Sequence, residues 1–413
     1  MRKKILIIGA GIGQVPMSQL VKKRGDYLIV VTIPGDYPCI DIADKVYFVD
    51  IFNREEVLRI AEAEHIDAVI SDQNDLMMPT VAFIAEKMGL PGNSVEQVES
   101  YCNKNKFRHI CDILNIPVPK HIKTTDLNVP ITFASIPFPW VVKPEDSQSS
   151  IGVSKVSSPE EYKVAIVKAL KKSRNNSAIV EEFIHGREVV AEGFVYKGEY
   201  YSLGFADRKY FDLNNLFLPS ETIFPSEIAQ SIQQEIIECE KRIAKHVNLS
   251  FAIVHSEYLV NELDSSFYIV ESAVRGGGVY ISSHLIPEYC GIDVNKILLD
   301  CCLDLEIDTS ILDIKECDKR ASAYKCFYLP KGVISNINGL DTLNTLPYVI
   351  KYDINLSIGE ETKEMTTKGQ RLGPILLRGH NRLDIENKLK EIESIISIQV
   401  TGLNGLVYET IWS

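Results

Sequence analysis

One stretch near the middle of the chain, residues 251–280, constrains the fold more than any other part of the 413-residue sequence. Two runs rich in β-branched and aromatic residues, Ala252–Val260 and Phe267–Val274, flank the polar connection 261–266. Strand-forming runs separated by a short polar segment are typical of a β-hairpin with a longer loop. We therefore expect an antiparallel strand pair here, around which the rest of the chain is organised.

Acidic side chains would share one face of this hairpin. Side chains alternate between the two faces of a strand, so residues of equal parity project together when the pairing register is even. The residues that this places on one face are His255, Glu257, Ile269 and Glu271. Two carboxylates on neighbouring strands, with Cβ atoms about 5–8 Å apart, raise each other's pKa unless a cation lies between them. The run 275–278, Arg-Gly-Gly-Gly, adds a fixed cation and closely approachable backbone. The stretch thus indicates a site for Mg²⁺ and phosphate, with a solvated hairpin as the alternative.

Length and composition indicate a globular protein of several domains. A chain of 413 residues is too long for one ordinary core, so we expect two or three domains. The net charge of −12 argues against non-specific affinity for nucleic acid or anionic membranes. Apolar runs such as 27–32 are far too short to span a membrane, and residues 1–4 precede too few apolar residues for a signal peptide. We therefore expect a cytoplasmic protein without nucleic-acid or membrane partners.

The cysteines indicate neither disulfides nor a metal site. There are nine, scattered along the chain without CxxC spacing, and no His/Cys cluster has the spacing of a zinc site. Cys301 and Cys302 are adjacent, which is a poor arrangement for chelating one metal. We interpret them as reduced thiols, most of which fill the core.

The first hundred residues alternate between strand and helix patterns. Residues 4–9 form a buried-strand run, followed by the glycine turn 9–14 and a helix, which is how a Rossmann-like unit opens. Gln14 stands where the dinucleotide fingerprint needs its third glycine, so a close-packed turn is favoured over NAD binding. Further strands are expected at 27–32, 46–50 and 67–71, and helices at 54–64 and 79–88. Ligands sit at the carboxyl ends of such strands, so Gln73 and Asp75 could face a substrate; an ordinary turn accounts for them equally well.

A buried lysine and a polar loop mark the next part of the chain. Lys143 lies in the strand pattern 140–144 and precedes the small-residue loop 145–153. Small residues that donate backbone N–H groups beside a lysine suit a triphosphate, although a surface turn is the alternative. The Walker pattern is absent, so the chain is not a P-loop NTPase. Segment 206–225 has no clean period and is predicted to be a loop. Strands are expected at 178–184, 189–196 and 199–204, and helices at 158–172, 228–246 and 294–302.

Short strands predominate from about residue 311 onward. They are expected at 322–329, 331–337, 348–354 and 375–379, together with a helix at 382–394. The turn-rich loop 366–374 could reach back over a site or cap the sheet.

The strand lysine, the small-residue loop, the acidic hairpin and the Arg-Gly-Gly-Gly run follow one another along the chain in an order and at spacings that resemble the ATP-grasp superfamily. The likeness is to its carboxylate–amine ligases, related to L-amino acid ligases and the pyrrolysine-pathway ligase, and it covers nearly the whole chain. It implies a multidomain α/β and α+β fold. The implied parts are a Rossmann-like pre-ATP-grasp domain over 1–101, an ATP-grasp domain over 102–310 with a phosphate flap at about 145–153, and a small β-rich C-terminal α+β domain over 311–413.

The resemblance implies a nucleotide site. Lys104 matches the first nucleotide-binding lysine, and Lys143 matches the strand lysine on the α- and β-phosphates, where it also assists catalysis. The flap residues over the triphosphate would be Ser149, Ser150 and Gly152. The hinge whose backbone reads adenine would be Glu181, Glu182, Phe183 and Ile184. Glu188 matches the acid that holds the ribose hydroxyls.

The resemblance also implies the metal and the catalytic arginine. Glu257 and Glu271 match two Mg²⁺-binding carboxylates, and Arg275 matches the arginine at the γ-phosphate and the acyl phosphate. ATP and Mg²⁺ are the implied cofactors, with Mn²⁺ as an alternative metal. The commonest form of the second metal strand is Glu-x-Asn-x-Arg, and Ala273 stands where that Asn would be. A second Mg²⁺ would have to rely on a bridging Glu271, water and phosphate oxygens.

The implied reaction joins a small-molecule carboxylate to an amine through an acyl phosphate and releases ADP and phosphate. The candidate substrate contacts are Asp207, Arg208, His255, Arg275, Gly277 and His284. Each histidine is also accounted for as a packed residue. Homodimers are common in the superfamily. The alternatives are an ATP-grasp carboxylase or carbamoyl-phosphate-type synthase, and a non-catalytic nucleotide-binding protein.

Overall fold

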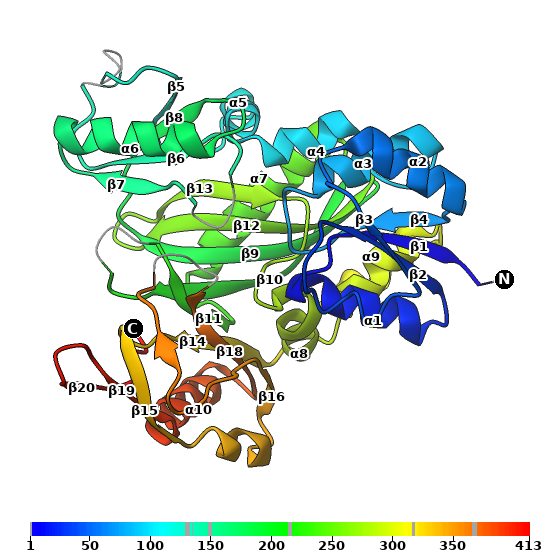
Figure 1. Ribbon diagram of the computed structural model, residues 1–413. Helices are drawn as coiled ribbons and strands as arrows, with labels where there is room; N and C mark the ends of the chain where they lie inside the picture. Colours follow the sequence, from blue (N-terminus) through cyan, green and yellow to red (C-terminus); the bar gives the residue numbers. More distant parts are fainter. Residues whose placement is uncertain are drawn as a thin grey trace.

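The computed structural model of the chain describes residues 2–128, 133, 135–147, 151–213, 217–315, 319–365 and 370–413 (Figure 1). Among the helices in these ranges, none combines the length and apolarity that crossing a bilayer requires. The fold combines several sheets with helices in a mixed α/β arrangement, as the sequence predicted.

The N-terminal region is a parallel four-stranded sheet with the order β3-β2-β1-β4. Its strands are β1 (Lys4–Ile8), β2 (Tyr27–Thr32), β3 (Lys45–Phe48) and β4 (Ala68–Ile70), and its helices are α1 (Val15–Lys23), α2 (Arg54–Glu64), α3 (Met78–Met88) and α4 (Val95–Cys102). β1 reads as a continuous apolar run because four of its five residues are buried. At its carboxyl end the Gln14 Nε2 donates to the Asp72 carbonyl at 2.5 Å. A buried amide therefore stands where a dinucleotide-binding turn would have glycine.

A small antiparallel sheet forms a lid beside this region, at the top of Figure 1. Its order is β5-β8-β6-β7, formed by β5 (His121–Thr124), β8 (Ala178–Glu182), β6 (Trp140–Pro144) and β7 (Ser154–Val156). Helix α5 (Lys104–Ile113) leads into the lid, and α6 (Pro159–Lys172) packs on it around buried Trp140 and Tyr162. Ser158 caps α6 and Pro159 opens it, because the first turn of a helix needs no N–H from proline.

The largest sheet is antiparallel, eight-stranded, and ordered β13-β12-β9-β10-β11-β14-β18-β16. The strands are β9 (Arg187–Tyr196), β10 (Glu199–Tyr210), β11 (Pro219–Phe224), β12 (Phe251–Asn261), β13 (Ser266–Ala273), β14 (Ala321–Phe327), β16 (Val349–Tyr352) and β18 (Leu372–Gly379). One face buries the apolar side of α7 (Gln230–Val247). The other packs against β1 and against α8 (Ile286–Cys290) and α9 (Val294–Cys302). The N-terminal region and the sheet thus share one core.

The prediction of a loop over 206–225 is wrong, because most of this segment is strand. β10 continues to Tyr210, and β11 covers Pro219–Phe224 with all six residues buried. The apolar alternation expected of a half-buried strand is missing because charged residues here are buried with partners. Glu221, for example, is 3% exposed and accepts from Lys325 at 2.8 Å.

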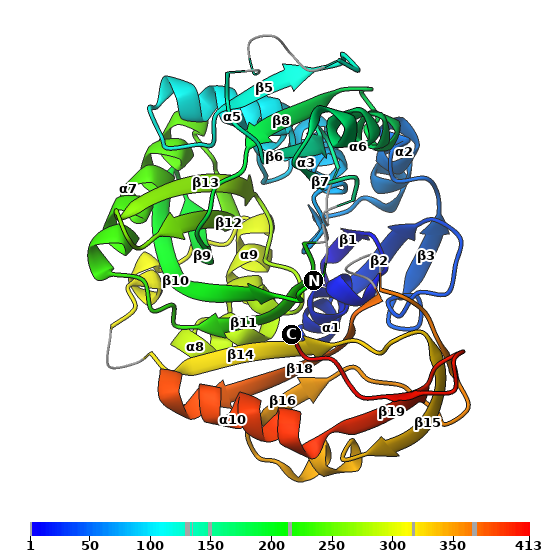
Figure 2. The same cartoon turned by 90° about the vertical axis from the view of Figure 1, so that its left-hand side faces the viewer.

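The C-terminal region continues the large sheet and adds a second one. β14 pairs with β11, so the sheet crosses residue 311 without a break. The second sheet has the order β17-β15-β19-β20, with β15 (Gly332–Asn338), β17 (Glu361–Thr362), β19 (Ser397–Thr401) and β20 (Val407–Tyr408), and α10 (Arg382–Ile395) packs between the two. Figure 2 shows the lid, the N-terminal region and the large sheet arranged in a ring, with the C-terminal region below.

Candidate active site

The β12–β13 hairpin brings the two predicted metal ligands together. Glu257 and Glu271 are directly opposite each other in the register, a position in which Cβ atoms lie about 5 Å apart. The expectation that Ile269 shares their face is wrong, because a bulge inserts an extra residue and pairs Ile269 with Tyr258. Ile269 is fully buried in the core beneath α7, whereas Val270 and Glu271 both line a cavity.

This cavity, of about 520 Å³, lies between the lid and the large sheet. It gathers most of the nucleotide-site residues predicted from the sequence. The predicted residues that line it are Lys104, Lys143, Glu181, Glu182, Phe183, Ile184, Glu188, Arg208, Glu257 and Glu271. Apolar side chains complete its wall: Pro119, Val141, Ile151, Leu259 and Val270. An apolar slot that ends in cations and carboxylates can hold a flat base at one end and charged phosphate at the other.

Lys143 on β6 belongs to a buried ionic triad. Its Nζ lies 2.5 Å from Glu181, and Glu181 also accepts from the Arg108 Nε at 2.8 Å. Burial alone would raise the pKa of Glu181, but the two cations outweigh it and lower the pKa to about 2. Burial lowers the pKa of Lys143, opposed by Glu181. Glu181 therefore positions Lys143 in the cavity through its carboxylate.

Lys104, at the start of α5, reaches the hairpin from the other side. Its Nζ donates to the Ser147 carbonyl at 2.7 Å and lies 3.1 Å from Glu271. Burial lowers its pKa, but Glu271 outweighs this and the net shift is upward, so the lysine is charged. Of the predicted flap, Ser149 and Ser150 lie outside the described residues. Gly152 has a φ of +81°, which favours glycine, and its neighbours Ile151 and Val153 line the cavity.

The ribose-site candidate Glu188 belongs to a second charged cluster. Arg208 donates to Glu188 at 2.9 Å and also binds Glu257, while the Tyr210 hydroxyl donates to the second Glu188 oxygen. Arg208 is 7% exposed and forms pairs with two acids, so it neutralises one metal-ligand candidate as Lys104 neutralises the other. Each predicted metal-ligand carboxylate thus has a cation beside it in the structure.

Arg275 connects the hairpin to the N-terminal region. Its guanidinium holds Asp75 by two hydrogen bonds of 3.0 and 2.7 Å. Burial alone would lower the pKa of Arg275 and raise that of Asp75, but their pairing reverses both shifts. Asp72, fully buried three residues earlier, accepts from the Gly276 N–H at 2.9 Å and the Ser282 hydroxyl at 3.2 Å. The end of β4 thus fixes the glycine run beside Arg275.

A buried His–Glu pair lies beneath the glycine run. His255 binds Glu192 through Nδ1, and its Nε2 lies 3.5 Å from Glu257. Burial lowers the pKa of His255, but Glu192 more than offsets this and raises it. A Cβ on Gly277 would meet Glu192 at 2.5 Å and His255 at 2.8 Å. Only glycine therefore fits this close approach. Ala273 is opposite His255 and buried, so no oxygen ligand stands there.

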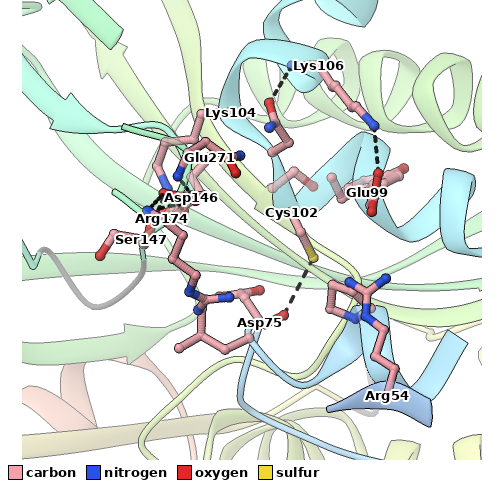
Figure 3. Close-up of a pocket in the computed structure, with 16 residues that line it drawn as sticks. Arg54, Asp75, Glu99, Cys102, Lys104, Lys106, Asp146, Ser147, Arg174 and Glu271 are labelled. Carbon is pink, nitrogen blue, oxygen red and sulfur yellow. Dashed lines mark hydrogen bonds and ion pairs between the residues drawn. The ribbon is translucent and has the colours of Figure 1, made fainter. Parts of the chain in front are cut away.

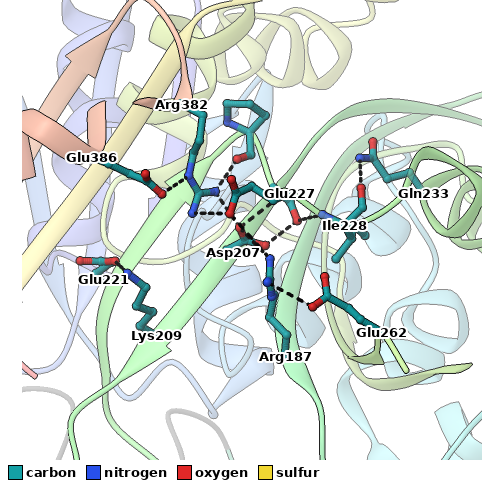
Figure 4. Close-up of polar contacts among 12 residues, drawn as sticks. Arg187, Asp207, Lys209, Glu221, Glu227, Ile228, Gln233, Glu262, Arg382 and Glu386 are labelled. Atoms are coloured by element: carbon teal, nitrogen blue, oxygen red, sulfur yellow. Dashed lines mark hydrogen bonds and ion pairs between the residues drawn. The ribbon is translucent and has the colours of Figure 1, made fainter. Parts of the chain in front are cut away.

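Two candidate substrate residues lie away from the cavity. Asp207, next to Arg208, points to the opposite face of β10, where Ser226 and Arg382 hold it at 2.5 and 2.6 Å (Figure 4). His284 packs against Tyr280 in a short π-helix, Ile281–Leu285, and burial lowers its pKa. Neither residue lines the cavity. His255, Arg275 and Gly277 do not line it either, so Arg208 is the one candidate substrate contact on its wall among the described residues.

The two glutamates fit a magnesium ion that arrives with a nucleotide. Within the described ranges, no three His, Cys, Asp or Glu side chains gather closely enough to hold a metal on their own. Mg²⁺ usually binds one or two carboxylates, keeps several waters and takes phosphate oxygens for the rest. Glu257 and Glu271, opposite each other on one cavity wall, supply that minimal set.

Sequence reasoning missed several residues that build the site. Asp72, Glu192 and Tyr210 belong to no local motif. Asp72 holds Gly276 from 204 residues away, and Glu192 holds His255 from 63 residues away. Tyr210 holds Glu188 on the neighbouring strand. One signal was available: an acid immediately after a buried strand of a parallel sheet, as Asp72 is, stands at the edge where ligands bind.

Comparison with known proteins agrees with this geometry. The ATP-grasp domain family matches residues 136–283, and L-amino acid ligase C-terminal domain 2 matches residues 325–401. Alanine–anticapsin ligase of Bacillus amyloliquefaciens is 23% identical over 379 residues, covering 82% of this chain and 78% of that protein. D-alanine–D-alanine ligase of Flavobacterium johnsoniae is 30% identical over 217 residues, covering 49% of this chain and 64% of that protein, less than two thirds of its length.

A solved structure shows the same architecture over nearly the whole chain. The L-amino acid ligase from Bacillus licheniformis superposes with a TM-score of 0.82 at 20% identity, covering 96% of this chain and 98% of that one. Residues 136–283 therefore form an ATP-grasp domain, and the chain as a whole has the fold of that L-amino acid ligase. The C-terminal region contains a match to L-amino acid ligase C-terminal domain 2.

Proposed function

We propose that the protein is an ATP-dependent carboxylate–amine ligase that forms an amide or peptide bond. In the first step a substrate carboxylate attacks the γ-phosphorus of ATP, giving an acyl phosphate and ADP. In the second an amine attacks the acyl carbon, the C–O bond to phosphate breaks, and phosphate leaves with its electron pair. The amine proton passes to solvent or to a nearby base.

The observation that carries the proposal is the wall of the 520 Å³ cavity. It combines an apolar slot, two lysines from separate elements, and two carboxylates placed opposite each other on the hairpin. Lys143 and Lys104 would neutralise phosphate oxygens, and Glu188 would accept from the ribose hydroxyls. Phosphoryl transfer asks little covalent work of a protein, so positioned charges are its principal means of catalysis.

Glu257 and Glu271 are the residues that would hold Mg²⁺. When bound, Mg²⁺ supplies neutralisation of the charge on the transferring phosphoryl oxygens. Arg208 and Lys104, which neutralise these carboxylates in the structure, would exchange partners when metal and nucleotide bind. Arg275 is next to this centre, and its planar guanidinium matches a phosphate or a carboxylate better than an ammonium would.

The test is phosphate release from MgATP across a panel of amino acids, amines and bicarbonate. A carboxylate and an amine supplied together should stimulate release, and the product should be an amide. Stimulation by bicarbonate alone would support a carboxylase or a carbamoyl-phosphate-type synthase instead. Release in none of the mixtures, with ATP still bound, would mean a nucleotide-binding protein without ligase activity.

The proposed reaction also suggests where the protein works. ATP is available in the cytoplasm, and we propose that the protein works there. Homodimerisation, common in the superfamily, is a further proposal that light scattering of the purified chain would test.

A further inference from the structure

A second cavity, of about 300 Å³, adjoins the nucleotide cavity (Figure 3). Lys104, Ser147 and Glu271 line both, so the two spaces meet at a predicted metal ligand. From there the second cavity runs between the lid and the N-terminal region. Its outer walls are built by α2, by the α4–α5 junction and by the turn after α6.

The acids that line this cavity already have partners. Each of them either forms an ion pair with a cation or accepts backbone N–H groups. The pairs are Asp75 with Arg275 at 2.7 Å, Glu99 with Lys106 at 2.7 Å, Glu271 with Lys104 at 3.1 Å, and Asp146 with the N–H groups of Arg174 and Asn175 at 3.1 and 3.2 Å. A ligand would therefore meet little uncompensated negative charge.

Two guanidinium groups are different. Arg54, in the first turn of α2, and Arg174, after α6, form no ion pair with any carboxylate in the described part of the chain. Arg174 lies with its Cζ 4.0 Å from the centre of the Phe52 ring. Stacking covers a face of the guanidinium and leaves its N–H groups pointing outward in the plane. Figure 3 shows Arg54 and Arg174 entering the cavity from different sides.

This inference rests on the proposed function. We propose that the second cavity binds the distal anionic group of one ligation substrate, so that this substrate carries a carboxylate or phosphate besides its reacting group. The reacting end would face Glu271, where the two cavities meet, and the distal anion would lie between Arg54 and Arg174. Arginine forms paired hydrogen bonds to such anions. Because Arg54 belongs to the N-terminal region and Arg174 to the lid, the bound anion would also hold the lid in place.

The test compares substrates that differ only in the distal charge. With MgATP and a fixed neutral partner, L-glutamate is compared with L-glutamine, and O-phospho-L-serine with L-serine. The wild-type protein should show a KM at least about tenfold lower for one anionic member than for its neutral analogue. A difference between L-glutamate and L-glutamine identifies a carboxylate as the distal group, and a difference between O-phospho-L-serine and L-serine identifies a phosphate.

Arg54→Gln and Arg174→Gln should each raise the KM of that anionic substrate about tenfold or more. The KM values for the neutral analogue and for MgATP should not change, which also shows that the variants fold. Arg59→Gln is the matched control, since Arg59 is on the same helix, exposed, and outside the cavity. Equal KM values for charged and neutral substrates, or unchanged values in both variants, would overturn the inference while leaving the ligase proposal intact.

If no mixture releases phosphate, the proposed function fails. Whether the second cavity binds an anion is then tested separately, by a binding measurement. L-Glutamate and O-phospho-L-serine are then titrated calorimetrically into protein saturated with Mg²⁺ and a non-hydrolysable ATP analogue. Binding that weakens about tenfold or more in Arg54→Gln, but not in Arg59→Gln, supports an anion site. No binding of either compound, or equal binding in all forms, overturns it.

Discussion

At the scale of single residues, the site is built from charges that neutralise one another across long sequence separations. Arg275 and Asp75 are 200 positions apart, and their pairing fixes the hairpin to the end of a strand in another region. Glu257 and Glu271 could be predicted from the sequence because strand parity alone puts them on one face. Asp72 and Glu192 could not, because a buried acid shows its purpose only once its partners are known.

Glu271→Gln should reduce ligase turnover by about a hundredfold or more, because it removes one of two carboxylates that would hold Mg²⁺ at the phosphates. The measurement is kcat for phosphate release at saturating ATP. Asp264→Asn, at the exposed tip of the same hairpin, is the control and should behave as wild type. Turnover of Glu271→Gln at the wild-type rate would contradict the metal assignment.

The glycine run offers a test with an internal control. A Cβ on Gly277 would lie 2.5 Å from a Glu192 oxygen, whereas a Cβ on Gly278 would meet nothing within 4 Å. Gly277→Ala should therefore displace the buried His255–Glu192 pair and lower kcat about tenfold or more, at a cost of about 1–3 kcal/mol in unfolding free energy. Gly278→Ala should change neither quantity. Equal behaviour of the two variants would argue against the close packing.

At the scale of elements, the sequence predicted most strands and helices. The errors arose where contacts between separate segments, which the local pattern does not show, determine the structure. Segment 206–225 was predicted to be a loop because buried ion pairs, such as Glu221 with Lys325, replace the apolar alternation of a strand. The bulge between Glu257 and Tyr258 is also invisible in the pattern, since it depends on how the two strands fit. It turns Ile269 into the core and leaves Val270 facing the cavity.

The buried triad of β6, β8 and α5 should make stability depend on pH. Glu181 has its pKa lowered to about 2 from an ordinary value of 4.5, against the upward effect of burial. Its ionised form therefore stabilises the fold above about pH 4.5, and this contribution is lost progressively as the pH falls toward 2. Glu181→Gln should cost about 3–5 kcal/mol at pH 7, since Lys143 and Arg108 lose their partner.

The check is chemical denaturation of both forms between pH 7 and pH 3. The difference in denaturant midpoint between wild type and Glu181→Gln should shrink as the pH drops below about 4.5. A difference that stays constant over this range would mean that Glu181 does not titrate as the triad requires.

At the scale of the whole molecule, the N-terminal region, the lid and the large sheet combine into one site. The sequence indicated the order of these regions but not the contacts that join them. The large sheet runs from the hairpin through β11 into β14 and so carries the C-terminal region as part of its own hydrogen-bonded structure. The N-terminal region shares a core with the same sheet. These contacts between regions arise from strand pairing and packing of segments that are distant in the sequence, which local patterns do not encode.

The central claim is that a substrate carboxylate attacks the γ-phosphate of ATP, and isotope transfer tests it most directly. The reaction is run with a carboxylate substrate labelled with ¹⁸O, an amine and MgATP, and the released phosphate is analysed by mass spectrometry. The account predicts ADP as the nucleotide product and one ¹⁸O atom in each phosphate, because the oxygen that attacks phosphorus leaves with it. Unlabelled phosphate, or AMP and pyrophosphate as products, would contradict it.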